Sequence, residues 1–299
     1  MNNPLVSVII ATYKRTKSLN SALNSLISQS YKNFEVIVVD DNADVAWSKE
    51  IEDIVNEFSK NNPTISLLYV RNDVNSGSAK TRNNGIKAAK GEYITFLDDD
   101  DLYLENKIEI QLKAMIENEA DFSITDLDLF NSQEKKVDSR VRSYIKQTDS
   151  DSLLKYHLLY HLTGTDTLMF KKSYLTKIGM FPLVDVGDEF YLMKEAICGQ
   201  GKFLYVPGCQ VKAYVHVEEE GLSSGQGKID GENILYEYKK TMFSLLDKKS
   251  IRYINMRHYA VLAFAELRRS KYFKFLYLGV KSFLIYPSKS LDLLLNRKS

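Results

Sequence analysis

Residues 92–101 read EYITFLDDDD, a short apolar run that ends in four consecutive aspartates. Adjacent carboxylates repel one another and raise one another's pKa values. A loop in water tolerates such a run, whereas a buried strand end requires a counter-charge. The candidates are a divalent cation, an arginine or lysine, and plain solvent, and the rest of the sequence is needed to choose among them.

Apolar, β-branched runs recur along the first 125 residues, and segments with helical spacing separate them. The runs at residues 6–11, 34–40, 65–70, 92–98 and 120–125 predict buried strands. Apolar residues three and four apart predict helices near residues 19–27, 51–58, 79–89 and 108–115. This alternation predicts an α/β fold with a Rossmann-like, mostly parallel central sheet flanked by helices.

Polar side chains gather where these predicted strands end. Ligands of open α/β sheets bind at the carboxyl ends of the strands. This edge would carry residues 12–13, 40–41 and 98–101 together with Arg71. The chain lacks the GxGxxG and GxxxxGK[ST] patterns, which excludes a dinucleotide site and a phosphate-loop ATPase.

The acidic residues at this edge allow more than one interpretation. Mg²⁺ and Mn²⁺ prefer carboxylate and phosphate oxygens, so residues 98–101 could hold a cation and a diphosphate. Alternatively they form a solvated loop, with Asp101 capping a helix that starts near Leu104. An ionised Asp40 would accept the N3–H of uracil, but Asp-Asp-Asn is also ordinary turn chemistry.

The second half of the chain is less periodic. Residues 185–197 predict a turn and a helix, with Asp188 and Glu189 in its first turn, where the helix dipole also favours acids. Residues 202–207 and 209–216 predict two short strands paired by a turn at Pro207–Gly208. We therefore expect one domain over residues 1–225 and a helical C-terminal extension over 226–299.

Composition restricts the location and the partners. The net charge is +1, and the two cysteines, Cys198 and Cys209, form no CxxC pair, which suits a reducing cytosol. No signal peptide or transmembrane run is present, so we expect an intracellular protein that is not transmembrane.

The C-terminus is basic and aromatic. Residues 251–299 carry ten lysines and arginines against two acids. Within them, residues 267–289 predict either an interfacial helix on an anionic membrane or a helix packed on the catalytic domain. Basic and aromatic residues also suit single-stranded nucleic acid, but nothing else in the chain supports a nucleic-acid partner.

Four motifs in order, VSVIIATYKR, FEVIVVDDNA, GSAKTRNNGIKAAKGEYITFLDDDD and GDEFYLMKEA, resemble family-2 glycosyltransferases of the GT-A fold. The resemblance covers residues 6 to about 220 and is strongest to bacterial enzymes that build surface polysaccharides. It implies an inverting enzyme that uses Mn²⁺ or Mg²⁺. The donor would be a UDP-hexose (galactose, glucose or an N-acetyl form), and the acceptor a saccharide, such as a lipid-linked capsule or exopolysaccharide repeat unit.

The resemblance also implies roles for single residues. The donor would be bound by Thr12 and Tyr13, with Tyr13 stacking on the base, and by Asp40 reading the base. Arg82 would lie near the nucleotide and phosphates. Asp98 and Asp99 match the ribose contacts.

The remaining implied roles concern the cation and the reaction. Asp100 matches the metal ligand, and His216 lies in a segment that closes over the diphosphate and would ligate metal or contact phosphate. Asp188 matches the catalytic base, although some members place the base at the position of Glu189.

Other functions fit the sequence less well. A nucleotidyltransferase needs a glycine-rich basic loop after the first strand, and ATYKRTKS contains no glycine. An enzyme acting on glycoprotein glycans and a non-catalytic nucleotide-sugar or glycan-binding module remain alternatives. We expect the enzyme in the cytoplasm, or peripheral on the inner face of the plasma membrane.

Overall fold

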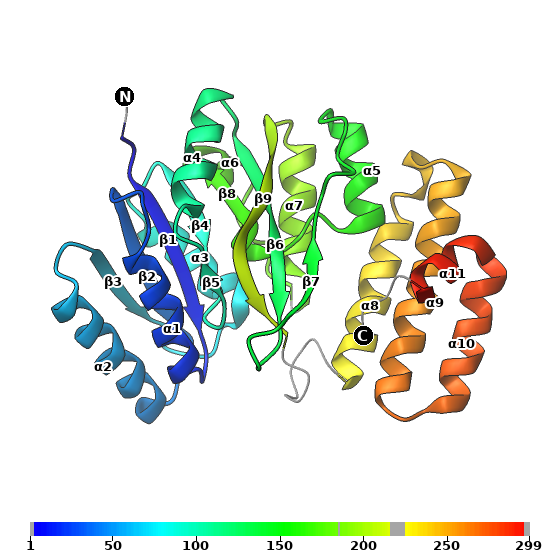
Figure 1. Ribbon diagram of the computed structural model, residues 1–299, viewed down its shortest axis with the longest axis horizontal. Coiled ribbons are helices and arrows are strands. Elements are labelled where there is room, and N and C mark those ends of the chain that lie inside the picture. Colours follow the sequence, from blue (N-terminus) through cyan, green and yellow to red (C-terminus); the bar gives the residue numbers. More distant parts are fainter. Residues whose placement is uncertain (1–2, 185, 216–224, 296–299) are drawn as a thin grey trace. The chain divides into compact units, whose positions relative to one another are not determined.

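The computed structural model describes residues 3–184, 186–215 and 225–295 (Figure 1). The predicted fold class is confirmed: one nine-stranded sheet is flanked by helices, and the C-terminal part is helical. The strands are β1 (Val6–Thr12), β2 (Phe34–Asp40), β3 (Ser66–Arg71), β4 (Tyr93–Phe96), β5 (Leu102–Tyr103), β6 (Phe122–Phe130), β7 (Lys136–Arg140), β8 (Leu168–Lys171) and β9 (Phe203–Tyr214). The helices are α1 (Thr16–Ile27), α2 (Val45–Asn61), α3 (Gly77–Ala88), α4 (Lys107–Glu117), α5 (Ser150–Tyr160), α6 (Lys172–Lys177), α7 (Asp188–Cys198), α8 (Gly225–Lys240), α9 (Lys248–Arg268), α10 (Tyr272–Ile285) and α11 (Pro287–Leu295), with short 3-10 helices η1 (Thr165–Thr167) and η2 (Phe243–Leu245).

The sheet is parallel in its first half and mixed in its second. Its strand order is β3-β2-β1-β4-β8-β6-β9-β5, and β7 pairs with β6. Strands β3, β2, β1 and β4 are parallel to one another, whereas β8 is antiparallel to both of its neighbours. All four parallel strands therefore point their carboxyl ends to one edge.

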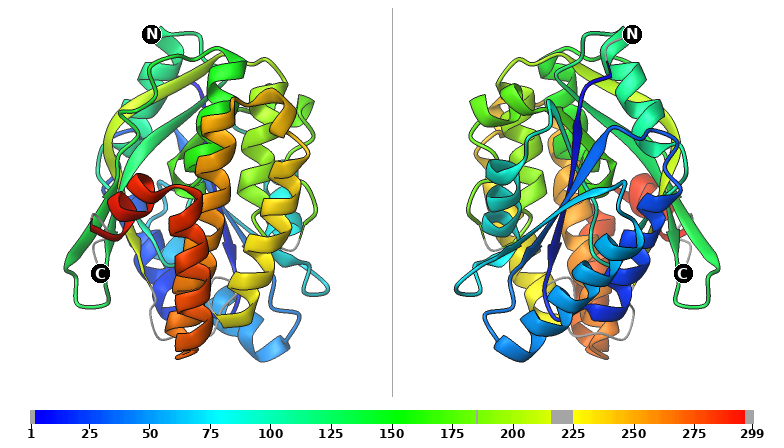
Figure 2. Two further views of the ribbon diagram at one scale, coloured as in Figure 1. Left: turned by 90° about the vertical axis from the view of Figure 1, so that its right-hand side faces the viewer. Right: turned by 90° about the vertical axis from the view of Figure 1, so that its left-hand side faces the viewer.

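Helices cover both faces of this sheet (Figure 2). Alternate residues of β1, such as Val8 and Ile10, pack in one core with the apolar faces of α1, α2 and α4. On the other face α3 lies against β1 and β2, where a Cβ on Gly85 would meet Ile9 at 2.5 Å. Burial on both faces explains why β1 and β2 are continuously apolar rather than alternating.

The predicted hairpin at Pro207–Gly208 is wrong. Residues 203–214 form the single strand β9, which runs parallel to β6 with register shifts around Asp126. Asp126 accepts hydrogen bonds from the Gly208 N–H and the Tyr205 hydroxyl, both at 2.9 Å. These bonds hold the Pro-Gly pair as an irregularity within the strand, with Gly208 at φ +110°.

The chain divides into two compact units. The first comprises residues 1–153 and 162–215, and the second comprises 154–161 and 216–299. The second unit thus includes most of α5, which the sequence pattern does not indicate. Its helices enclose a small core of Ile229, Leu262 and Ala265, on which Leu278 packs. Among the described residues, no helix is both long enough and apolar enough to cross a membrane.

We predict that Gly91→Ala destabilises the first unit. An added Cβ would lie 2.7 Å from the Ser7 backbone nitrogen and 2.9 Å from the Leu5 carbonyl oxygen. Overpacking of this kind costs about 1–3 kcal/mol. The matched control is Gly279→Ala in α10, where no atom lies within 4 Å and helix propensity favours alanine. Thermal unfolding should show a lower Tm for Gly91→Ala alone, and equal Tm values would contradict this packing.

Candidate functional site

The carboxyl ends of the parallel strands form the candidate site, as predicted. Thr12, Asp40 and Arg71 end β1, β2 and β3 and lie beside one another in the strand register. Asp98 follows β4 by two residues. Helix α3 and the first turn of α7 complete the same region, because Arg82 of α3 donates to Asp98 and Ser78 of α3 donates to Asp188 of α7.

The first two acids of this edge are buried. The Asp40 carboxylate is fully buried and accepts hydrogen bonds from the Tyr69 hydroxyl at 2.7 Å and the Asn42 backbone N–H at 2.8 Å. Asp41 accepts the backbone N–H groups of Ser76 and Gly77 at 2.8 and 2.9 Å, and so fixes the start of α3. The base-reading role of Asp40 stays a prediction, since this carboxylate does not face solvent here.

The loop after β1 meets the aspartate run. Arg15 forms an ion pair with Asp100 and lies 3.8 Å from an oxygen of Asp99. Burial raises the pKa of Asp99 to about 6, although Thr12 and Arg15 act against this shift. The Tyr13 ring is 45% exposed, so it is accessible for stacking.

Arg82 of α3 connects the aspartate run to α7. Its guanidinium donates to Asp98 at 2.7 Å and to Asp188 at 3.0 Å, and it lies over the Phe181 ring at 5.5 Å. Burial alone would lower the pKa of Arg82, but the carboxylates of Asp98 and Asp188 outweigh it and raise this pKa. Two acids that are 90 residues apart in sequence thus share the guanidinium of Arg82.

Asp188 and Glu189 point to different partners. Besides Arg82, Asp188 accepts the Ser78 hydroxyl at 2.9 Å, and its side chain is buried. Glu189 accepts the Gly164 N–H at 2.9 Å and the Thr165 hydroxyl at 3.1 Å. Asp188 therefore belongs to the group around Asp98, whereas Glu189 is bonded to the segment that leads into η1.

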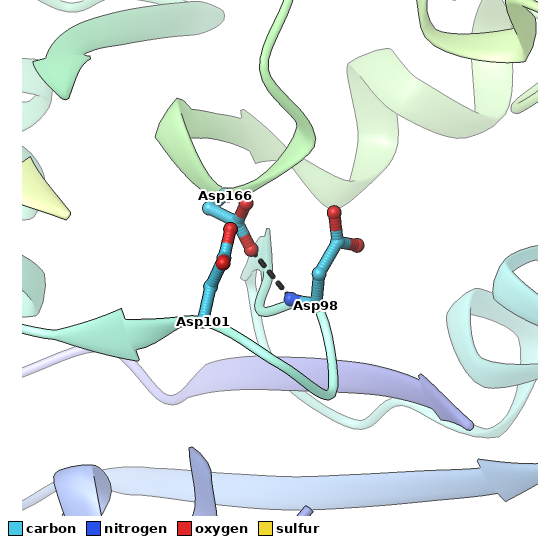
Figure 3. Close-up of side chains that lie close together, drawn as sticks. All are labelled: Asp98, Asp101 and Asp166. Atoms are coloured by element: carbon cyan, nitrogen blue, oxygen red, sulfur yellow. Dashed lines mark hydrogen bonds between the residues drawn. The ribbon is translucent and has the colours of Figure 1, made fainter. Parts of the chain in front are cut away.

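Asp166 is a member of the site that the sequence reasoning missed. Carboxylate oxygens of Asp98, Asp101 and Asp166 lie within 4.8 Å of one another (Figure 3). Asp166 lies in η1 and accepts the Asp98 backbone N–H. The local sequence GTDT, residues 164–167, gives no sign that this aspartate belongs to the site. Asp166 reaches the site because η1 leads into β8, and β8 pairs with β4 although the two strands are far apart in the sequence.

Burial raises the pKa values of both Asp101 and Asp166. The pKa of Asp101 rises to about 7, and the nearby charge of Asp98 contributes to this shift. The pKa of Asp166 rises well above its ordinary value, and the charges of Asp98 and Asp101 raise it further. The predicted helix cap at Asp101 is wrong: α4 begins at Lys107, and Asp101 accepts the Tyr214 N–H at 2.8 Å instead.

The half-buried acids are more accessible to a cation than the buried pair. Mg²⁺ keeps several water or phosphate ligands, so it needs carboxylates that solvent and a diphosphate can reach. Asp98 and Asp100 are half-buried and each pairs with an arginine, whereas Asp101 and Asp166 are 7% and 3% exposed. The role of Asp100 as a metal ligand stays a prediction.

The predicted histidine ligand, His216, lies outside the described residues. The other three histidines, His157, His161 and His258, belong to the second unit. His157 is fully buried, and His258 stacks on Tyr236 with ring centroids 3.8 Å apart. Burial lowers the pKa of His161 well below its ordinary value.

Comparison with known proteins identifies relatives of this chain. It is 32% identical over 150 residues to the putative teichuronic acid biosynthesis glycosyltransferase TuaG of Bacillus subtilis, which covers 50% of this chain and 57% of that one. It is 33% identical over 132 residues to an Escherichia coli enzyme, UDP-Glc:alpha-D-GlcNAc-diphosphoundecaprenol beta-1,3-glucosyltransferase WfgD, with 44% of this chain and 49% of that one covered. The chain spans less than half the length of the first curated relatives that it matches, between 18% and 45% of each.

The fold is shared with a solved structure. The crystal structure of S. aureus TarS 1-349 in complex with UDP-GlcNAc superposes with a TM-score of 0.61 at 20% identity, over 93% of this chain and 91% of that one. This likeness shows the GT-A fold. The model of the family described as "Glycosyl transferase family 2" matches residues 7–176, more than half of the chain. This chain therefore belongs to glycosyl transferase family 2.

Proposed function

We propose that this chain is an inverting, metal-dependent hexosyltransferase of polysaccharide biosynthesis. The observation that carries the proposal is the Arg82 bridge. It joins Asp98, in the acidic loop where the donor would bind, to Asp188, the expected base, at the ligand-binding edge of a family-2 domain. Residues 1–225 would form the catalytic domain and residues 226–299 the helical extension.

The chemistry proposed for Asp188 is proton acceptance. A carboxylate takes the proton of the acceptor hydroxyl while that oxygen bonds to the anomeric carbon from the face opposite the diphosphate. The bond from that carbon to the diphosphate oxygen breaks, the nucleoside diphosphate leaves, and the configuration inverts. Hydrogen bonds from Arg82 and Ser78 to one Asp188 oxygen would orient the carboxylate for this step.

Donor binding would use the half-exposed residues of the edge. The Tyr13 ring would stack on the base, and Asp98 and Asp99 would contact the ribose. Asp100, together with His216, would hold Mn²⁺ or Mg²⁺, which supplies positive charge beside the diphosphate when bound. Arg15, which pairs with Asp100 here, could turn to the diphosphate once the cation takes its place.

The relatives support a donor and an acceptor class. The names of WfgD and TarS refer to UDP-Glc and to UDP-GlcNAc, so we propose a UDP-hexose donor. The WfgD name also specifies a diphosphoundecaprenol-linked acceptor, which supports a lipid-linked saccharide reached from the cytoplasmic face. A glycoprotein glycan acceptor and a non-catalytic nucleotide-sugar-binding module are the alternatives.

The first test is calorimetric binding of UDP-Glc, UDP-Gal, UDP-GlcNAc and UDP-GalNAc with and without Mn²⁺, followed by an assay for donor hydrolysis. We expect metal-dependent binding of one UDP-sugar and slow release of UDP from it. Binding without any turnover would favour the non-catalytic module. Failure of every UDP-sugar to bind with Mn²⁺ present would contradict the donor class.

The matched pair Asp188→Asn and Glu189→Gln identifies the base. Both variants keep the size of the side chain and remove its ability to accept a proton. We expect Asp188→Asn to lower kcat at least about 100-fold, the usual contribution of a general base, with little change in donor affinity. Glu189→Gln should keep kcat within about tenfold, since Gln can still accept from Gly164. The reverse result would assign the base to Glu189.

A second set of variants separates the exposed acids from the buried pair. In Asp166→Asn the amide can accept from the Asp98 N–H and donate to Asp101, so we expect Mn²⁺ affinity within about threefold of the parent chain. Asp100→Asn removes the proposed ligand and should weaken Mn²⁺ binding at least about tenfold. Titration calorimetry with Mn²⁺ and UDP measures both. Loss of Mn²⁺ binding in Asp166→Asn alone would show that the buried carboxylates are the ligands.

A further inference from the structure

Helix α10 packs on α9 through one apolar face. The Ser282 hydroxyl donates to the Met256 carbonyl oxygen at 2.9 Å, and Phe275 packs on Phe264 with ring centroids 6.2 Å apart. Leu278 contributes to the small core of the second unit. Figure 2 shows the two helices side by side. This face accounts for the attachment of α10 to its own unit.

The opposite face of α10 is also apolar, and it is exposed. Its residues share the spacing i, i+3, i+4, i+7 and i+11, which places them in one row along the helix. We call this row the α10 stripe. It consists of Phe273, Leu276, Tyr277, Val280 and Leu284, with exposed fractions of 92%, 59%, 66%, 57% and 71%.

A helix that is apolar on both sides is expected in a protein core or in contact with lipid. Helix α10 has 14 residues, about 21 Å of helix, and a hydrocarbon core of about 30 Å is too thick for it to span. The α10 stripe instead suits a helix that lies in the plane of a bilayer surface, with aromatic and leucine side chains in the boundary between headgroups and acyl chains.

The charge around the stripe favours an anionic surface. Residues 267–290, which contain α10, carry six lysines and arginines and no acidic residue. Lys281, on the flank of α10, is held 4.1 Å from the centre of the Tyr259 ring. Lysine and arginine side chains near an anionic bilayer are attracted to its surface, so this charge would add to the binding by the apolar stripe.

A second copy of this chain fits the α10 stripe less well than a lipid surface does. From Phe273 to Leu284 the row is about 16 Å long and one helix wide. A stable protein interface buries about 800 Å² on each partner, which is more than five side chains in one row provide. A positively charged surface around the row would also repel an identical copy.

We propose that the α10 stripe inserts into the headgroup region of a bilayer that contains anionic lipid and holds the second unit on that surface. The stripe contains none of the residues proposed for donor binding, metal binding or catalysis, so the proposal goes beyond the proposed function and does not require it.

The test is co-sedimentation of the full chain with vesicles of phosphatidylcholine, with and without about one third phosphatidylglycerol. The stripe variant is Phe273→Gln with Leu276→Gln and Leu284→Gln. The matched control is Ile234→Gln with Leu245→Gln, two side chains of the same unit that are 59% and 66% exposed. Circular dichroism confirms equal helix content before the comparison.

We expect the parent chain and the control to bind anionic vesicles equally, and the stripe variant to bind at least about tenfold more weakly. Neutral vesicles and high salt should reduce binding several-fold. The proposal would be overturned if the parent chain did not bind anionic vesicles, or if the stripe variant bound them equally well. It would also be overturned if light scattering showed the parent chain as a dimer and the stripe variant as a monomer, with neither chain binding vesicles. UDP-sugar binding, which is proposed to use none of the substituted residues, should be the same in all three chains, so failure here is distinguishable from failure of the proposed function.

Discussion

The arrangement of the site depends on the guanidinium of Arg82. It donates hydrogen bonds to Asp98 in the loop after β4 and to Asp188 at the start of α7. Removing Arg82 would leave both carboxylates without this counter-charge. Lysine would not replace it, because the planar fork of arginine reaches two carboxylates at once and a single ammonium does so less well.

The four aspartates after β4 are compensated in different ways, which answers the question posed by their sequence. Asp98 pairs with Arg82 and Asp100 with Arg15. Asp99 is buried, and its raised pKa records incomplete compensation. Asp101 accepts the Tyr214 N–H at 2.8 Å, and burial raises its pKa. Two arginines thus compensate two of the four carboxylates in the absence of a ligand, and a cation would compete with an arginine at the half-buried positions.

The sequence predicted the parallel half of the sheet well because its signals are local. Continuous apolar runs identify β1 and β2, and the rule that parallel strands share a carboxyl edge then places Thr12 beside Asp40. The second half depends on contacts between distant segments. Asp126 turns an apparent Pro-Gly hairpin into one irregular strand, and η1 brings Asp166 to the loop after β4 from about 65 residues further along the chain. No local pattern encodes either arrangement.

The C-terminal helix shows a different limit of sequence patterns. Residues 267–289 predicted either a packed helix or an interfacial one, and these seemed to be alternatives because amphipathic helices usually have a single apolar face. Helix α10 has two: one is occupied by α9, and the other, the α10 stripe, faces solvent. The periodicity of the sequence does not distinguish these two faces, because together they leave few polar positions on the helix. If the acceptor is lipid-linked, a helix that keeps the chain at the bilayer surface would let enzyme and acceptor meet by diffusion along the membrane. This would raise the effective concentration of the acceptor without any additional contact in the transferase site.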